Sequence, residues 1–112
     1  MCSSDLLRKA GQPGLAPMAH ALLGAGEALL AQGRPAEAVA PLREAVALRE
    51  KLLPAQSWEL AVARVRLGEA LKRSHGEGAT ALLSQGLSVL TEQLGGEHAQ
   101  VQRARKAIAT AG

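Results

Sequence analysis

A pair of apolar-periodic segments occurs twice in this chain, and this repeat constrains the fold more than any other feature. Residues 25–53 read AGEALLAQGRPAEAVAPLREAVALREKLL, two segments with apolar residues at helical spacing around a Gly-Arg-Pro break. The tetrad Gly26–Leu29 recurs as Gly68–Leu71, 42 positions later (68 − 26). In the second segment, the residues that recur 41 positions later (83 − 42) are Leu42, Ala45, Val46 and Leu48, as Leu83, Gly86, Leu87 and Val89. A period of this size is typical of an α-solenoid, so the sequence predicts an all-α fold of antiparallel helix pairs.

The repeated residues resemble the tetratricopeptide repeat (TPR) in its longer variety of about 42 residues, found in kinesin light chains and in bacterial signalling and kinase-associated proteins. The matching positions are a glycine within the first helix, a glycine in the turn, and small and large apolar residues along the second helix. They are Gly26, Gly33, Ala38, Leu42 and Ala45 in the first copy, and Gly68, Ala79, Leu83 and Gly86 in the second. The resemblance covers about residues 15–110 and implies a right-handed α-solenoid.

The resemblance and the apolar spacing together divide the chain. We expect one domain at 15–110, with repeat 1 at about 15–53, repeat 2 at about 58–94 and a C-terminal capping helix at about 98–110. The predicted helices are 15–32, 36–53, 58–73, 78–94 and 98–109. Residues 1–14 are expected to be disordered or artefactual, because segment 11–14 breaks regular structure and segment 2–6 resembles a translated sequencing adapter.

The first predicted helix carries one apolar stripe at spacings of three and four, formed by Leu15, Met18, Leu22, Ala25 and Leu29. Gly26 within this helix costs about 1 kcal/mol relative to alanine, which is tolerable if a neighbouring helix packs directly on it. In the second helix, Leu42 is expected to be among the most buried residues. Two repeats are fewer than the three or so that usually fold alone. We therefore expect a fragment whose first helix lacks the repeat on which it stacks.

The composition indicates which residue types build the core and which cellular compartment is favoured. Hydrophobic residues make up 47% of the chain but aromatic residues only 1%, so the core must be built from Leu, Val and Ala. No run of eighteen uncharged apolar residues occurs, and no membrane span or secretory signal is expected. A single cysteine excludes an internal disulfide and favours a reducing, cytoplasmic location. The dominance of Ala, Leu and Arg indicates a GC-rich bacterial genome.

The sequence contains no pattern typical of catalysis or of metal binding. His20, His75 and His98 lie in different repeats or turns, and none has a Cys, His or carboxylate at the spacing of a metal site. The glycine pairs lack the lysine and serine or threonine of a phosphate loop. We therefore expect neither an enzyme nor a metal site, cofactor or small-molecule substrate.

Basic residues give the chain a net charge of +3 and a pI of about 9.6. They cluster on two predicted helices, as Arg64, Arg66, Lys72 and Arg73 and as Arg103, Arg105 and Lys106. Such clusters are compatible with nucleic-acid or acidic-ligand binding. No aromatic residues lie among them to stack on bases, so nucleic acid is disfavoured.

The resemblance also implies a binding surface, because the family's concave face is lined by residues of the first helix of each repeat. The corresponding residues are His20, Leu23, Glu27, Leu30 and Ala31 in the first copy, and Val62, Val65, Glu69, Lys72 and Arg73 in the second. Glu27 and Glu69 are expected to lie side by side and to select a basic residue of a peptide, with Leu23, Val62 and Val65 as apolar contacts. An acidic ligand would instead use Lys72 and Arg73.

Two functions are compatible with these residues. The first is a protein–protein interaction scaffold at the C-terminal end of a larger bacterial signalling or kinase-associated protein. The second is a structural end-cap of a longer repeat array that has no ligand of its own. The sequence does not specify the partner or the oligomeric state, and motifs of this kind determine fold better than function.

Overall fold

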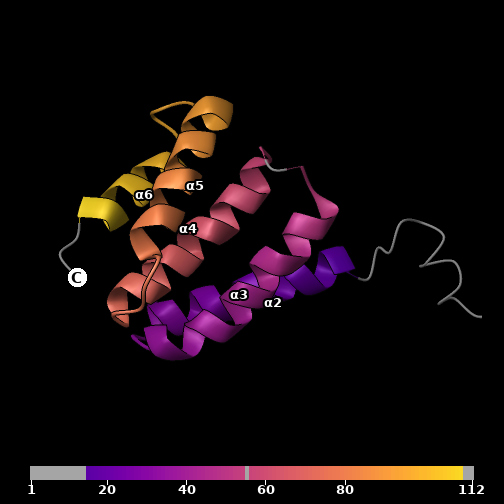
Figure 1. The fold of residues 1–112 in the computed structure, drawn as a ribbon, viewed down its shortest axis with the longest axis vertical. Coiled ribbons are helices and arrows are strands. Elements are labelled where there is room, and N and C mark those ends of the chain that lie inside the picture. Colours follow the sequence, from indigo (N-terminus) through magenta and orange to yellow (C-terminus); the bar gives the residue numbers. More distant parts are fainter. Residues whose placement is uncertain (1–14, 55, 110–112) are drawn as a thin grey trace, which may run out of the picture.

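The structure is a computed structural model that describes residues 15–54 and 56–109. These residues form five α-helices and no strand. The helices are α2 (Leu15–Ala31), α3 (Pro35–Leu52), α4 (Trp58–Arg73), α5 (Ala79–Leu94) and α6 (Ala99–Ala109) (Figure 1). Each helix predicted from the sequence is present, with ends that differ by at most one residue from the prediction. The all-α class is therefore confirmed, whereas the expectation for residues 1–14 lies outside the described residues.

Local signals in the sequence set the ends of these helices. Gly33, with a φ of 76°, lies in the turn after α2, where its amide donates to the Leu30 carbonyl. Pro35 then begins α3 at a position where no intrahelical donor is needed. Ser57 caps α4, because its hydroxyl oxygen accepts a hydrogen bond of 3.3 Å from the Glu59 amide.

The same glycine–leucine contact joins both helix pairs. α2 packs on α3 where Gly26 meets the Leu42 side chain, so closely that any Cβ on Gly26 would overlap it. α4 packs on α5 where Gly68 meets Leu83, and a Cβ on Gly68 would lie 2.8 Å from the Leu83 Cγ. The condition under which Gly26 is tolerable, a helix packed directly on it, is therefore met. The two contacts are separated by the offsets of the sequence repeat, so the two hairpins are built alike.

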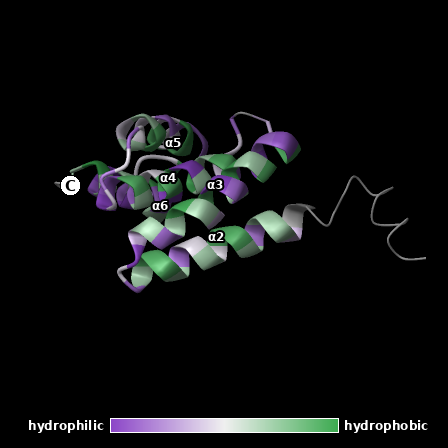
Figure 2. Ribbon diagram, turned by 60° about the horizontal axis from the view of Figure 1, so that its bottom comes forward, coloured by the Kyte–Doolittle hydropathy of each residue, from purple (hydrophilic) through white to green (hydrophobic). Residues whose placement is uncertain are grey.

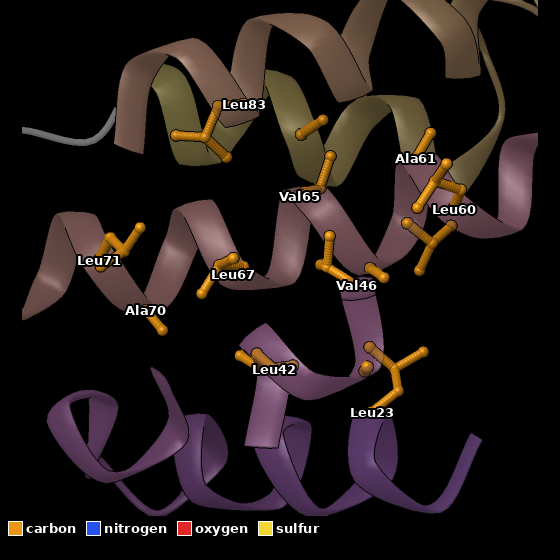
Figure 3. Packing of buried hydrophobic residues seen from close by; sticks show 14 of the residues in the cluster. Leu23, Leu42, Val46, Leu60, Ala61, Val65, Leu67, Ala70, Leu71 and Leu83 are labelled. Atoms are coloured by element: carbon orange, nitrogen blue, oxygen red, sulfur yellow. The ribbon is translucent and has the colours of Figure 1, made fainter. Parts of the chain in front are cut away.

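Helix α4 lies at the centre of the molecule, between the α2–α3 pair and α5 with α6 (Figure 1). Every residue from Leu60 to Leu71 is buried except Arg64. The core around α4 is aliphatic, and Figure 3 shows Leu42 of α3 and Leu83 of α5 among its side chains. Leu42 is 0% exposed, as predicted. Trp58, by contrast, is 43% exposed and does not belong to this core.

The predicted apolar stripe of α2 is not the face that the structure buries. Met18 is 50% exposed, and Ala25 is also exposed. The buried residues lie one position further along the chain, at Ala19, Leu23, Gly26 and Leu30. Within α2 only His20 and Glu27 are polar, and Figure 2 shows mostly hydrophobic colours along this helix. Because apolar residues lie on almost every side, the spacing alone does not identify the packed side.

Candidate functional site

Most of the residues expected to line a binding face are inside the protein. Those with less than a tenth of their surface exposed are Leu23 (6%), Leu30 (4%), Val62 (5%), Val65 (0%) and Glu69 (7%). Leu23, Val62 and Val65, which were expected as apolar contacts for a partner, therefore make their contacts within the core. His20, Ala31 and Arg73 are exposed, and Glu27 and Lys72 are partly exposed.

Arg66 of α4 holds three helices together from a buried position. It is 1% exposed. Its Nε donates to Glu27 Oε2 of α2 at 2.9 Å, and its Nη2 donates to Gln100 Oε1 of α6 at 2.5 Å. Its Nη1 lies 3.7 Å from Glu69 Oε1, one turn along α4, and makes no hydrogen bond. Glu27 and Glu69, which were expected side by side, thus contact the same guanidinium group.

The charges of this cluster largely compensate one another. Burial, and then the positive charge of Arg103, lower the pKa of Arg66, while the hydrogen bond to Glu27 and the charges of both carboxylates raise it. The Arg66 guanidinium group remains charged despite its burial, because the ordinary pKa of arginine is very high. Arg103 of α6 also forms a forked pair with Glu69, at 3.3 Å (Nε–Oε2) and 3.2 Å (Nη2–Oε1). Both carboxylates are therefore already bound to arginines.

Two adjoining surface pockets lie beside this cluster, between α2, α4 and α6. One has a volume of about 300 Å³ and is lined by Glu69, Arg73, Arg103, Lys106 and Ala107. The other has a volume of about 390 Å³ and is lined by Glu27, Leu30, Ala31, Arg73 and Arg103. Both are lined by Arg73 and Arg103, so the two pockets adjoin at these residues, and we call them together the charged channel. Arg73 is held at its wall by a hydrogen bond of 3.2 Å from Nη1 to the Leu30 carbonyl.

Lys72 of α4 attaches the last turn of α6 to α4. Its ammonium group donates to the carbonyls of Ala107 at 2.9 Å and Ile108 at 2.6 Å, in the last turn of α6. A cation at the C-terminal end of a helix is favourable, because the carbonyls there have no intrahelical partner. In this structure Lys72 therefore positions α6, whereas the sequence suggested it as a contact for an acidic ligand.

His20 is separate from the charged channel. It lines a pocket of about 180 Å³ where α2 and α4 begin and α3 ends, together with Ala19, Arg49, Leu52, Leu53 and Glu59. Arg49 closes one side of this pocket by donating to the Glu59 carbonyl at 2.6 Å. The structure thus groups Glu27 and Arg73 around the channel and places His20 elsewhere.

The residues that α6 contributes to the channel were not predicted from the sequence as a binding surface. Lys106 and Ala107 lie three and four positions after Arg103, so the three share one face of this helix. This spacing was a usable signal. It was overlooked because the expected binding face was confined to the first helices of the two repeats, and because Arg103 was grouped with its basic neighbours.

The basic cluster predicted on α4 does not form one exposed surface. Arg66 is buried, Lys72 is bound to α6, and Arg64 pairs with Glu50 of α3 at 3.3 Å. Among the described residues, no group of three or more His, Cys, Asp and Glu side chains could hold a metal ion. No helix in the described part of the chain has the length and hydrophobicity needed to cross a membrane.

Comparisons with protein-family models, with curated proteins and with solved structures find no match to this chain.

Proposed function

We propose that this chain is a protein-interaction module of the tetratricopeptide-repeat type, a right-handed solenoid of two helix pairs with α6 as its cap. The glycine–leucine contact that recurs in both hairpins supports the repeat architecture. The sequence resemblance supports the class and a place within a larger bacterial signalling or kinase-associated protein. We propose no catalytic step, cofactor or small-molecule substrate.

The charged channel is the proposed binding site, and the two pockets that meet at Arg73 and Arg103 are the observation that carries this proposal. Three helices contribute its walls, so a peptide segment lying along it would contact both hairpins and the cap. Rim charges of this kind mainly affect association rate and specificity. No aromatic side chain lines the channel to stack on bases, so the partner in this proposal is a charged peptide segment and not a nucleic acid.

The charges of the channel favour an acidic segment over a basic one. Glu27 and Glu69 are already bound to Arg66 and Arg103, and the Glu69 side chain is only 8% exposed. Arg73 is exposed, and 44% of the Arg103 side chain is exposed. An approaching carboxylate would find guanidinium donors, whereas an approaching lysine would have to compete with arginines that already occupy both glutamates.

Two labelled peptides of equal length, one a Glu-Ser repeat and one a Lys-Ser repeat, test this function by fluorescence anisotropy. We expect the acidic peptide to bind more tightly, with affinity that falls as salt is raised. Arg73→Glu should weaken its binding by about tenfold, which corresponds to about 1.4 kcal/mol. Arg43→Glu, at an exposed position of α3, is the matched control and should leave binding unchanged.

Tighter binding of the basic peptide would contradict this proposal, because the channel would then prefer a basic segment. A single-stranded DNA oligonucleotide that binds more tightly than either peptide would favour the nucleic-acid alternative. Absence of binding to all three probes would favour the structural end-cap, which the exposed apolar side of α2 also supports.

A further inference from the structure

One of the two pockets of the charged channel is lined mainly by cationic side chains. The pocket of about 300 Å³ has three basic residues, Arg73, Arg103 and Lys106, and one acidic residue, Glu69, which gives its lining a net charge of +2. The adjoining pocket has two arginines and Glu27, a net charge of +1. We call the first the Lys106 pocket, because Lys106 lines it and not the other. An anion with more than one charge is therefore attracted more strongly to the Lys106 pocket.

The two arginines of the Lys106 pocket have N–H groups that the described residues leave without an acceptor. Arg73 uses Nη1 for the Leu30 carbonyl, and it forms no ion pair with a residue in 15–54 or 56–109. Arg103 uses Nε and Nη2 for Glu69. The remaining guanidinium nitrogens are Nε and Nη2 of Arg73 and Nη1 of Arg103. Lys106, which has an interaction of its own, adds positive charge to the same pocket.

Glu69 is the lining residue that would repel an anion, and Arg66 offers it a second partner. The Glu69 Oε1 lies 3.2 Å from Arg103 Nη2 and 3.7 Å from Arg66 Nη1. This Nη1 is buried and makes no hydrogen bond in the described part of the chain. A shift of the carboxylate by about 1 Å would bring it to hydrogen-bond distance of Arg66. If an anion draws Arg103 away from Glu69, Arg66 therefore receives the carboxylate, and no buried charge loses its partner.

We propose that the Lys106 pocket binds a phosphate monoester, the side chain of a phosphoserine or phosphothreonine in an acidic peptide segment, between Arg73 and Arg103. This inference rests on the proposed peptide-binding function of the charged channel and specifies its ligand. A phosphoryl group has a charge of about −1.5 to −2 at pH 7 and three acceptor oxygens. It thus matches both the net charge of the lining and the three remaining arginine nitrogens, whereas a carboxylate offers one charge and two oxygens.

The phosphodiester of a nucleic acid fits this pocket less well. Each phosphate of such a backbone has a single negative charge. Two of its oxygens are esterified, so two are left to accept hydrogen bonds from the arginines. A phosphorylated peptide end or loop can also place its single phosphate between Arg73 and Arg103 while the acidic residues on either side lie along the rest of the channel.

Three labelled peptides that differ only at the centre of the Glu-Ser repeat test this inference on the full chain by fluorescence anisotropy. The first is unmodified, and the second has one central phosphoserine. The third has glutamate in place of the central serine and of the next serine, which adds two negative charges without a phosphate. We expect the phosphoserine peptide to bind about tenfold more tightly than the third peptide, because the forked arginine donors match a phosphate.

Variants of the pocket locate the phosphate. Glu69→Gln keeps an acceptor oxygen for Arg103 but removes the repelling charge, so it should tighten binding of the phosphoserine peptide by about threefold or more. Glu92→Gln makes the same change of charge at an exposed position of α5 and should leave binding unchanged. Arg73→Gln should abolish the preference for phosphoserine over the third peptide, while the exposed Arg43→Gln should retain it. Circular dichroism of each variant checks that its helical content is unchanged.

The outcomes separate this inference from the proposed function. Equal affinities of the phosphoserine peptide and the third peptide would overturn the phosphate site but leave an acidic segment as the partner. Absence of binding to all three peptides would overturn both. A phosphoserine preference that persists in Arg73→Gln would place the phosphate outside the Lys106 pocket. Displacement of the peptide by inorganic phosphate at an equal concentration would show that a free phosphate compound, and not a peptide, is the ligand.

Discussion

The contact between Gly26 and Leu42 allows a quantitative test of the helix packing. Gly26→Ala gains about 1 kcal/mol of helix propensity. It also places a methyl group inside the volume of the Leu42 side chain, and overpacking of this kind costs about 1–3 kcal/mol. The single change should therefore be neutral to destabilising by about 2 kcal/mol. Leu42→Ala removes a completely buried side chain and should cost about 2–5 kcal/mol.

The double variant should be more stable than the sum of these effects predicts. Once Leu42 is truncated, the methyl group added at position 26 no longer overlaps it and fills part of the cavity, while the propensity gain remains. The expected coupling energy is about 1–3 kcal/mol, equal to the overpacking that disappears. Urea denaturation followed by circular dichroism, with the osmolyte TMAO added to keep the weakest variant folded, measures all four proteins.

The second hairpin supplies an internal comparison. A Cβ on Gly68 would meet Leu83 but also the Ala79 carbonyl oxygen at 3.2 Å, and that backbone atom remains after Leu83→Ala. The coupling of Gly68→Ala with Leu83→Ala should therefore be smaller than that of the first pair. Coupling below about 0.5 kcal/mol at Gly26, which is the scatter of independent sites, would refute the assigned contact.

Three further outcomes are expected. Arg66→Met should cost about 1–3 kcal/mol in urea denaturation, because it leaves Glu27 and Gln100 without their donor while Glu69 stays paired with Arg103, and unchanged stability would contradict this account. Lys72→Met should speed hydrogen exchange in the last turn of α6 by about tenfold while α4 keeps its protection, and unchanged exchange would show that the two carbonyl contacts do not hold α6. Trp58 fluorescence should shift little on unfolding, because this side chain is already 43% exposed, and a large blue-shifted native emission would contradict that exposure.

The helices and their pairing were predictable because they depend on local signals and on a repeat that is visible in the sequence. Gly26 and Leu42 were correctly identified, since a mid-helix glycine at a repeated position requires a close neighbour and Leu42 lies on the matching face. The packed side of α2 could not be identified in the same way. Apolar residues surround that helix, so the choice between Met18 and Ala19 depends on tertiary contacts.

The Arg66 cluster beside the charged channel was harder to predict from the sequence, because the residues that contact one another are distant along the chain. Arg66 reaches Glu27 and Gln100, which are 39 and 34 positions away. No local pattern distinguishes this arginine from Arg64, which lies on the other side of the helix and pairs with Glu50. The resemblance implied that Glu27 and Glu69, one repeat apart, would be neighbours, but it did not imply that arginines would already neutralise them.

Arg66 also bears on why this chain adopts one packing arrangement. A core of Leu, Val and Ala contains many side chains of similar shape, and such cores can lose uniqueness before they lose stability. The Arg66 guanidinium meets Glu27 and Gln100 only when α2 and α6 lie in one register along α4. If either helix shifted by one turn, the buried Arg66 guanidinium would lose a hydrogen-bond partner, at a cost of several kcal/mol. The arginine thus penalises the misregistered states that the aliphatic residues would tolerate.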